Sequence, residues 1–274
     1  MNGLALFAGY GGLELGAGAA FGGGVRTVCY VERESYAASI LVARMEEASL
    51  DQAPIWDDVT TFDGKPWRGV VDIITAGFPC QPFSAVGKRM GTEDERWVWS
   101  DISRIIGEVR PRWFVGENVV GLANKGGGLL EILGSLATLG YDAIWGALRA
   151  SEVGATQRRE RLFILAKLAD ADRSGLQGHG GEPERQVRRQ ESQRQVGGGG
   201  LQMFAPRVDE VVVWGRVLED SPSLEPSVCR MDSRASERLE YAQDRIRTLG
   251  NGVVPLQAAV AIRMLADRAG WVIC

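Results

Sequence analysis

Short apolar runs alternate with segments of helical period over the first 168 residues. This pattern is typical of a parallel sheet whose two faces are covered by helices. We expect six strands, in the apolar runs at 4–8, 27–32, 71–76, 113–118, 141–148 and 161–168. The predicted fold class is therefore α/β, doubly wound, with a mostly parallel sheet.

Segments between these runs carry apolar residues on one helical face. The spacing i, i+3, i+4, i+7 occurs in two sets, which are Ile102, Ile105, Ile106 and Val109, and Leu129, Ile132, Leu133 and Leu136. Each set predicts a helix that packs on the sheet. Near the C-terminus, Leu256, Val260 and Met264 recur every four residues and predict a further helix that rejoins the first domain.

The middle of the chain differs from the first 168 residues in composition and in periodicity. After Leu168 the residues are polar, rich in Gly, Arg and Gln, and show neither period. We therefore divide the chain into a catalytic and cofactor-binding domain at 1–168, a small and partly flexible target-recognition region at 169–245, and a returning segment at 246–274. A basic cluster in the middle region could follow phosphates or belong to a solvated loop; it comprises Arg173, Arg185, Arg188, Arg189 and Arg194.

Composition narrows the function classes. No apolar run approaches the roughly 20 residues that cross a bilayer, and the N-terminus lacks a leader pattern, so we expect a cytoplasmic protein without a membrane partner. Four scattered cysteines and one histidine predict neither a disulfide scaffold nor a metal site. The net charge of −4 means that any nucleic-acid binding must come from local basic patches.

A glycine-rich turn follows the first predicted strand. In FAGYGGLELG, Gly9, Gly11 and Gly12 let the backbone approach a ligand at the N-terminus of a helix. Glu32 ends the next strand, where an acidic side chain of a doubly wound fold accepts hydrogen bonds from ribose. A third glycine at the dinucleotide spacing is missing, so the pattern favours a nucleoside cofactor other than NAD.

Cys80 directly follows the strand predicted at 71–76, which puts it at the carboxyl edge of the sheet, where ligands bind. Cysteines are most often buried core residues. Here, however, Pro79 and Pro82 stiffen the loop, and Ser84 and Lys88 give it polar and basic character. We therefore interpret Cys80 as a nucleophile.

Seven segments of the chain, taken together, resemble the DNA cytosine-5 methyltransferase family, of bacterial or phage type. They are FAGYGG, the acidic Glu32, DDVT, GFPCQPFS, ENV, QRRER and LGNGVVP, in the order and spacing of the family. The resemblance spans residues 4–168 and about 246–266. It implies a Rossmann-like sheet of the S-adenosylmethionine-dependent methyltransferases with a small target-recognition lobe.

The resemblance also implies the chemistry. Cys80 would add to C6 of cytosine and so activate C5 for methylation, with Gln81 beside it in the same motif. Glu117 matches the glutamate that bonds N3 of the base, and Asn118 would hold that geometry. Arg161 and Arg159 match arginines that approach the base carbonyl and the adjoining phosphate.

The implied cofactor is S-adenosylmethionine, and no metal is required. The positions that match its binding site are Phe7, Gly9, Gly11, Gly12, Glu32, Asp58, Pro79, Val98 and Asn251. Among these, Asp58 matches the aspartate that bonds the adenine amino group, and Asn251 would reach the methionine end. The chain departs from the family at Ala5, where an aspartate is usual.

The implied partner is double-stranded DNA, bound by a monomer that flips its target cytosine out of the stack. Candidate DNA contacts are Ser84, Lys88, Arg89, Gln157, Arg207, Trp214 and Arg230. Two alternatives remain open at this point, a tRNA cytosine-5 methyltransferase of the same fold and a catalytically inactive DNA-binding homologue.

Overall fold

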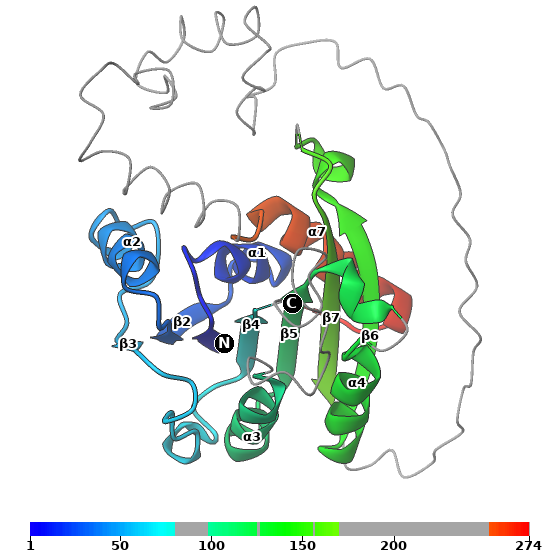
Figure 1. The fold of residues 1–274 in the computed structure, drawn as a ribbon, viewed down its shortest axis with the longest axis horizontal. Helices are drawn as coiled ribbons and strands as arrows, with labels where there is room; N and C mark the ends of the chain where they lie inside the picture. The colour runs from blue at the N-terminus through cyan, green and yellow to red at the C-terminus, as the bar shows by residue number, and fades with distance from the viewer. Residues whose placement is uncertain (80–97, 125–126, 156, 170–251, 274) are drawn as a thin grey trace, which may run out of the picture.

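A seven-stranded sheet forms the centre of the described part of the protein (Figure 1). The computed structural model describes residues 1–79, 98–124, 127–155, 157–169 and 252–273. The strand order is β3-β2-β1-β4-β5-β7-β6, and the strands are β1 Asn2–Leu6, β2 Arg26–Val31, β3 Ile55–Trp56, β4 Ile73–Gly77, β5 Trp113–Asn118, β6 Tyr141–Arg149 and β7 Glu160–Leu168.

Most of the sheet is parallel, as the sequence predicts. Strands β3, β2, β1, β4 and β5 run parallel to one another, whereas β7 pairs antiparallel with both β5 and β6. The parallel strands therefore bring their carboxyl ends to one edge of the sheet. Ligands of open α/β sheets bind at this edge.

Helices cover both faces of the sheet (Figure 1). One face packs against α3 (Trp99–Val109) and α4 (Leu129–Thr138), whose predicted apolar faces supply the core residues Ile102, Ile106 and Ile132. The other face packs against three helices, α1 (Gly12–Ala20), α2 (Ser35–Glu46) and α7 (Pro255–Ala269). The doubly wound prediction is therefore confirmed.

Several strand bounds differ by one or two residues from the sequence predictions, and three differences have a physical reason. The first strand ends at Leu6 and not at residue 8, because Phe7 turns out of the strand with φ 54°. The short strand β3 was not predicted, because two residues carry no periodic signal. In α7, Met264 is 47% exposed, and the buried face is formed by other residues, among them Ala258, Ile262 and Leu265. A spacing of four residues drifts by about 40° per step on a helix, so it does not follow one face.

Helix α7 packs against α1 although the two are far apart in sequence. A Cβ built on Gly16 of α1 would lie 2.5 Å from the Cβ of Ala258 and 2.7 Å from the carbonyl oxygen of Pro255. The glycine thus allows the two helix backbones to approach closely. Arg263 of α7 also donates to the carbonyl oxygens of Ala19 and Ala20, at 2.9 and 3.2 Å.

Among the described residues, no helix combines the length and the apolar character that crossing a bilayer requires.

We predict that Gly16→Ala and Gly18→Ala, two identical changes on α1, have opposite effects on stability. At Gly16 the new methyl group meets the backbone of α7, and such overpacking costs about 1–3 kcal/mol. At Gly18 it meets no described atom within 4 Å, and alanine stabilises a helix by about 0.5–1 kcal/mol over glycine. Urea unfolding of the two variants measures both changes; destabilisation of equal size in both would contradict the close α1–α7 contact.

Candidate active site at the carboxyl edge of the sheet

Gly77, the last residue of β4, lies where three segments of the chain converge. It pairs with Glu117 in the β4–β5 register. A Cβ built on Gly77 would lie 3.7 Å from the carbonyl oxygen of Phe7, 3.9 Å from Oε2 of Glu117 and 3.9 Å from Cγ2 of Val253. The turn after β1, the end of β5 and the C-terminal segment therefore meet around one residue at the ligand-binding edge of the sheet.

The turn between β1 and α1 has a strained backbone. Phe7, Gly9 and Gly11 have φ values of 54°, 56° and 84°. A positive φ is costly for a bulky residue such as Phe7, and strain of this kind is commonest at functional sites. A Cβ on Gly11 would collide with Leu50 at 2.5 Å, whereas a Cβ on Gly9 would meet no described atom within 4 Å. Gly11 thus serves packing, and Gly9 leaves open space beside the backbone.

The carboxylate of Glu32 is fixed beside this turn. The backbone N–H of Gly9 donates to Oε2 of Glu32, and the N–H of Glu34 donates to Oε1, both at 2.8 Å. Each carboxylate oxygen can accept a second hydrogen bond. The glycine turn thus orients Glu32, the side chain that the sequence predicts to bind the ribose of the cofactor.

Glu117 is a buried carboxylate with an arginine partner. It is 6% exposed, and its Oε1 lies 3.0 Å from Nε of Arg161. In the antiparallel β5–β7 register, Glu117 lies opposite Phe163, so Arg161 is its diagonal neighbour on the same face. Burial raises the pKa of Glu117 to about 7, although the charges of Arg161 and Arg159 lower it in part. Both the protonated and the ionised forms are therefore populated near neutral pH.

Asn118 fixes the backbone just before the predicted nucleophile. It is 2% exposed, its Nδ2 donates to the carbonyl oxygen of Phe78 at 3.3 Å, and its Oδ1 accepts from the N–H of Val119 at 2.8 Å. The ring of Phe78 also contacts the ring of Trp99, with centroids 6.0 Å apart. These contacts hold together the two ends from which the stretch 80–97 departs.

Asp58 follows the short strand β3. Its Oδ1 accepts hydrogen bonds from the backbone N–H and the hydroxyl of Thr60, at 2.9 and 2.8 Å. Those two hydrogen bonds lower the pKa of Asp58, and the charge of Arg33 lowers it further. Because Arg33 follows Glu32 in sequence, the two carboxylates predicted to bind the cofactor belong to one neighbourhood.

The C-terminal segment docks on the glycine turn. The hydroxyl of Tyr10 donates to the carbonyl oxygen of Val253 at 2.5 Å. A Cβ on Gly252 would lie 1.6 Å from Cε1 of Tyr10, so the ring rests directly on the glycine backbone. Arg44 also holds Tyr10, donating to its carbonyl oxygen at 2.6 Å and lying 5.7 Å from its ring centroid.

Gln257 connects α7 to strand β6 and to Arg159, the residue before β7. Its side chain is fully buried, and Nε2 donates to the carbonyl oxygens of Leu148 and Arg159, at 2.8 and 3.0 Å. The carbonyl of Arg159 also accepts from the N–H of Ala150 at 2.8 Å. The backbone at Arg159 is therefore held by α7 as well as by the end of β6.

The remaining predicted residues are placed as follows. Val98 is half-buried at the start of α3 and packs on the core, Pro79 is the exposed end of a described range, and Gln157 is exposed before β7. Outside the described residues lie Cys80, Gln81, Ser84, Lys88, Arg89, Arg207, Trp214, Arg230 and Asn251. Their predicted roles stay predictions.

Sequence reasoning missed Tyr10, Thr60 and Gln257. Thr60 had a local signal, because a hydroxyl residue two positions after an aspartate is typical of a hydrogen-bonded turn. Gln257 stands alone in an apolar helical segment, and a buried amide needs partners. The contact between Tyr10 and Val253 joins residues 243 positions apart and had no local signal.

The described residues support neither Cys29 as a nucleophile nor a metal site. Cys29 is 3% exposed, and burial raises the pKa of its thiol to about 11, so it is a core residue and no nucleophile. No group of three or more His, Cys, Asp or Glu side chains within the described ranges could hold a metal ion.

Comparison with known proteins agrees with this geometry. A family model described as C-5 cytosine-specific DNA methylase matches residues 1–224. The chain belongs to the C-5 cytosine-specific DNA methylase family.

Members of this methylase family with curated names are similar over part of their length. The Type II methyltransferase M.PspPI of Psychrobacter sp. (strain TA137) is 39% identical over 169 residues, which cover 60% of this chain and 39% of M.PspPI. The Type II methyltransferase M.NlaX of Neisseria lactamica is 37% identical over 166 residues, covering 60% of this chain and 51% of M.NlaX. The match thus spans about two-fifths to one-half of these relatives.

A solved structure has the same fold. A DNMT2 variant of Spodoptera frugiperda aligns with a TM-score of 0.50 and 20% identity, covering 65% of this chain and 53% of that one. This likeness concerns the fold alone.

We predict that the raised pKa of Glu117 makes stability pH-dependent. The folded-state pKa of about 7 lies above the ordinary glutamate value of 4.5, so the contribution of Glu117 to stability is present below pH 4.5 and is lost as pH rises to about 7. Relative to Glu117→Gln, the free energy of unfolding of the wild type should fall by up to about 3 kcal/mol over this window, from 1.36 kcal/mol per pKa unit.

Urea unfolding of both proteins at pH 4.5 to 8 measures that difference. Because Arg161 lowers the pKa of Glu117, the Arg161→Met background should extend the window to higher pH. A difference between wild type and Glu117→Gln that does not vary with pH would contradict the prediction.

Proposed function

We propose that this protein transfers a methyl group from S-adenosylmethionine to C5 of cytosine in double-stranded DNA. Membership of the C-5 cytosine-specific DNA methylase family supports the reaction class. The observation that carries the proposal is the buried carboxylate of Glu117, with its pKa of about 7 and its ion pair to Arg161, beside the strand end that leads to Cys80. We further infer a monomer in the cytoplasm, where cellular DNA is the substrate.

The cofactor proposal is consistent with the described residues. Gly9 leaves open space at the N-terminus of α1, and the carboxylates of Glu32 and Asp58 can accept hydrogen bonds from ribose and from the adenine amino group. Phe7, Pro79 and the half-buried Val98 would supply apolar contacts. When bound, S-adenosylmethionine supplies an electrophilic methyl group. Asn251, outside the described residues, would bind its methionine end.

The proposed chemistry begins with the thiolate of Cys80. Its sulfur forms a bond to C6 of cytosine, the C5–C6 double bond opens, and C5 becomes nucleophilic. The protonated form of Glu117 donates a hydrogen bond or a proton to N3 as negative charge builds on the ring. Once C5 carries the methyl group, it would lose its proton to solvent, the sulfur–C6 bond would break with Cys80 leaving as a thiolate, and N3 would return any proton it took to Glu117, which restores the aromatic ring.

The raised pKa of Glu117 suits this role. An unshifted glutamate is ionised at neutral pH and has no proton to give. With a pKa of about 7, a large fraction of Glu117 carries one. Arg161 and Arg159 would then approach the base carbonyl and the neighbouring phosphate, and they keep the pKa from rising further.

Recognition of DNA is assigned to the remaining candidates. Gln157 is exposed before β7, and it would approach the DNA together with Ser84, Lys88 and Arg89. Readout of the target sequence is proposed for the region 169–245, with Arg207, Trp214 and Arg230 as candidates. The family match favours DNA over tRNA as substrate, and the paired Glu117 and Arg161 speak against an inactive homologue.

The proposed reaction predicts how two substitutions change turnover. Cys80→Ser should reduce methyl transfer to background and abolish the covalent adduct with duplex DNA that contains 5-fluorocytosine, because a hydroxyl without a base is a poor nucleophile. Glu117→Gln should lower the rate by about 100-fold or more. Labelled-methyl transfer to duplex DNA, with tRNA as a parallel substrate, measures both effects.

Cys29→Ala is the matched control for the cysteine change, because Cys29 is buried in the core and should leave the adduct unchanged. Substantial turnover by Cys80→Ser, or transfer to tRNA alone, would refute the proposed function.

The proposed cofactor site predicts how a substitution at Gly9 changes ligand affinity. Gly9→Ala places a methyl group in the open space beside the turn and should weaken binding of S-adenosylhomocysteine by about tenfold or more, measured by calorimetry. Gly22→Ala is the control, since Gly22 also has a positive φ, of 67°, and open space around it, but lies beyond the end of α1. Equal loss in both variants would mean that backbone strain alone is responsible.

A further inference from the structure

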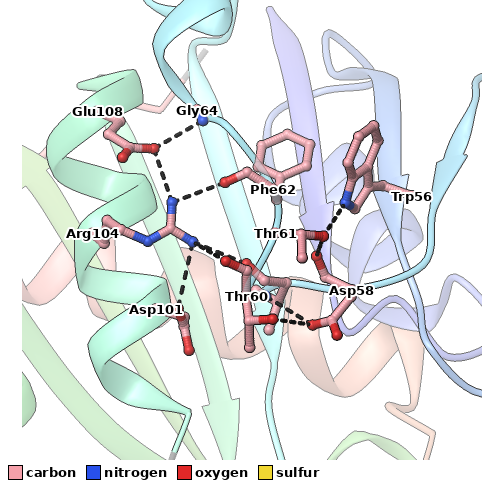
Figure 2. A network of polar contacts seen from close by, with 10 residues as sticks. Trp56, Asp58, Thr60, Thr61, Phe62, Gly64, Asp101, Arg104 and Glu108 are labelled. Atoms are coloured by element: carbon pink, nitrogen blue, oxygen red, sulfur yellow. Dashed lines mark hydrogen bonds and ion pairs between the residues drawn. The ribbon is translucent and has the colours of Figure 1, made fainter.

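Arg104 of α3 holds the segment that contains Asp58 (Figure 2). Its Nη2 donates to the carbonyl oxygens of Val59 and Thr60, at 3.0 and 3.3 Å, and its Nη1 donates to the carbonyl oxygen of Phe62 at 2.8 Å. One guanidinium group therefore binds three backbone carbonyls within four consecutive residues. A planar guanidinium provides such a fixed set of donors, which a lysine ammonium cannot reproduce.

The guanidinium of Arg104 is itself held in place by two acidic residues of α3. Asp101 and Glu108 lie three residues before it and four residues after it, at 3.4 and 3.1 Å. Glu108 also accepts from the backbone N–H of Gly64 at 2.8 Å. Helix α3 thus fixes both ends of the stretch 59–64 (Figure 2).

This stretch has little other support from the sheet. The preceding strand, β3, has two residues and lies at the edge of the sheet. The side chain of Trp56 adds one hydrogen bond, from Nε1 to Oγ1 of Thr61 at 3.1 Å (Figure 2). The buried side chains of Val59 and Phe62 anchor the stretch in the core, and Arg104 adds the hydrogen bonds that fix its backbone carbonyls.

The contacts continue from Arg104 to the carboxylate of Asp58. Thr60, whose carbonyl binds Arg104, donates both its N–H and its hydroxyl to Oδ1 of Asp58. These two hydrogen bonds, both to Oδ1, orient the plane of the carboxylate. A shift of the Thr60 backbone would rotate that carboxylate.

We propose that Arg104 is a positioning residue for recognition of the adenine ring, acting through Thr60 on Asp58. This inference rests on the proposed function, in which Asp58 accepts a hydrogen bond from the adenine amino group. Arg104 does not touch the cofactor. It presets the carboxylate so that less ordering is needed when the adenine binds.

The test is the affinity of the full chain for S-adenosylhomocysteine and for its inosine analogue, which has an oxygen in place of the amino group. The variant is Arg104→Lys, which keeps the charge but loses the three-carbonyl geometry. We expect affinity for S-adenosylhomocysteine to fall about tenfold and affinity for the inosine analogue to change less than threefold. The preference for adenine should therefore shrink.

Arg68→Lys is the matched control. Arg68 also joins this region to α3, donating to the carbonyl oxygens of Gly107 and Glu108, both at 2.8 Å, and neither of these hydrogen bonds involves residues 58–60. We expect Arg68→Lys to leave the adenine preference within twofold of the wild type. Equal effects of the two variants on both ligands would overturn the inference, because Arg104 would then be a general support of α3.

A double-mutant cycle with Asp58→Asn tests the route of the effect. If Arg104 acts through Asp58, Arg104→Lys should cost less than threefold once Asp58 is replaced. Fold-changes that multiply fully would overturn the inference. Failure of the wild type to bind S-adenosylhomocysteine would refute the proposed function and this inference together, whereas binding without an effect of Arg104→Lys would refute only this inference.

Discussion

Burial of the Glu117 carboxylate at the end of β5 is the constraint on which the arrangement of the site depends. A carboxylate removed from water at this depth requires compensating charge, which Arg161 supplies from the neighbouring antiparallel strand β7 and Arg159 from just before it. The compensation is incomplete, because desolvation outweighs both arginines in setting the pKa. The reversed direction of β7 is what brings the arginines to the same edge as the ends of the parallel strands.

At the same carboxyl edge of the sheet, the turn after β1 contacts the segment that begins at Gly252. Tyr10 rests on Gly252 and donates to Val253, while Gln257 holds the backbone at Arg159. The segment 252–257, which leads into α7, therefore connects the turn at Gly9 to the backbone of Arg159. In the proposed function, this connection keeps the cofactor and the base in fixed relation.

Much of the fold was predictable, because long periodic segments carry their own signal. Strand β5 and the buried faces of α3 and α4 were predicted at the residues that the structure has. Short or geometrically special segments were less predictable. The two-residue β3 has no period, and the early end of β1 follows from the positive φ of Phe7, a conformation that sequence rarely signals in a bulky residue.

The sequence indicated many residues of the candidate site but not the contacts that position them. Sequence order and family resemblance indicated Glu117, Arg161, Glu32 and Asp58. They did not indicate that Gly9 orients Glu32 or that Arg104 supports the stretch after Asp58, because those contacts join residues 23 or more positions apart. Roles assigned to Cys80 and to the recognition region stay predictions, since those residues lie outside the described ranges.

The α1–α7 contact also has a consequence for how the chain folds during synthesis. Leu13 and Ala17 of α1, with Trp113 of β5, share a core cluster with residues of α7, which are translated after all the strands of the sheet. Until that helix leaves the ribosome, this side of the nascent sheet lacks its apolar cover. A nascent chain that lacks α7 therefore exposes an apolar surface, which α7 can cover only after all the strands have been made.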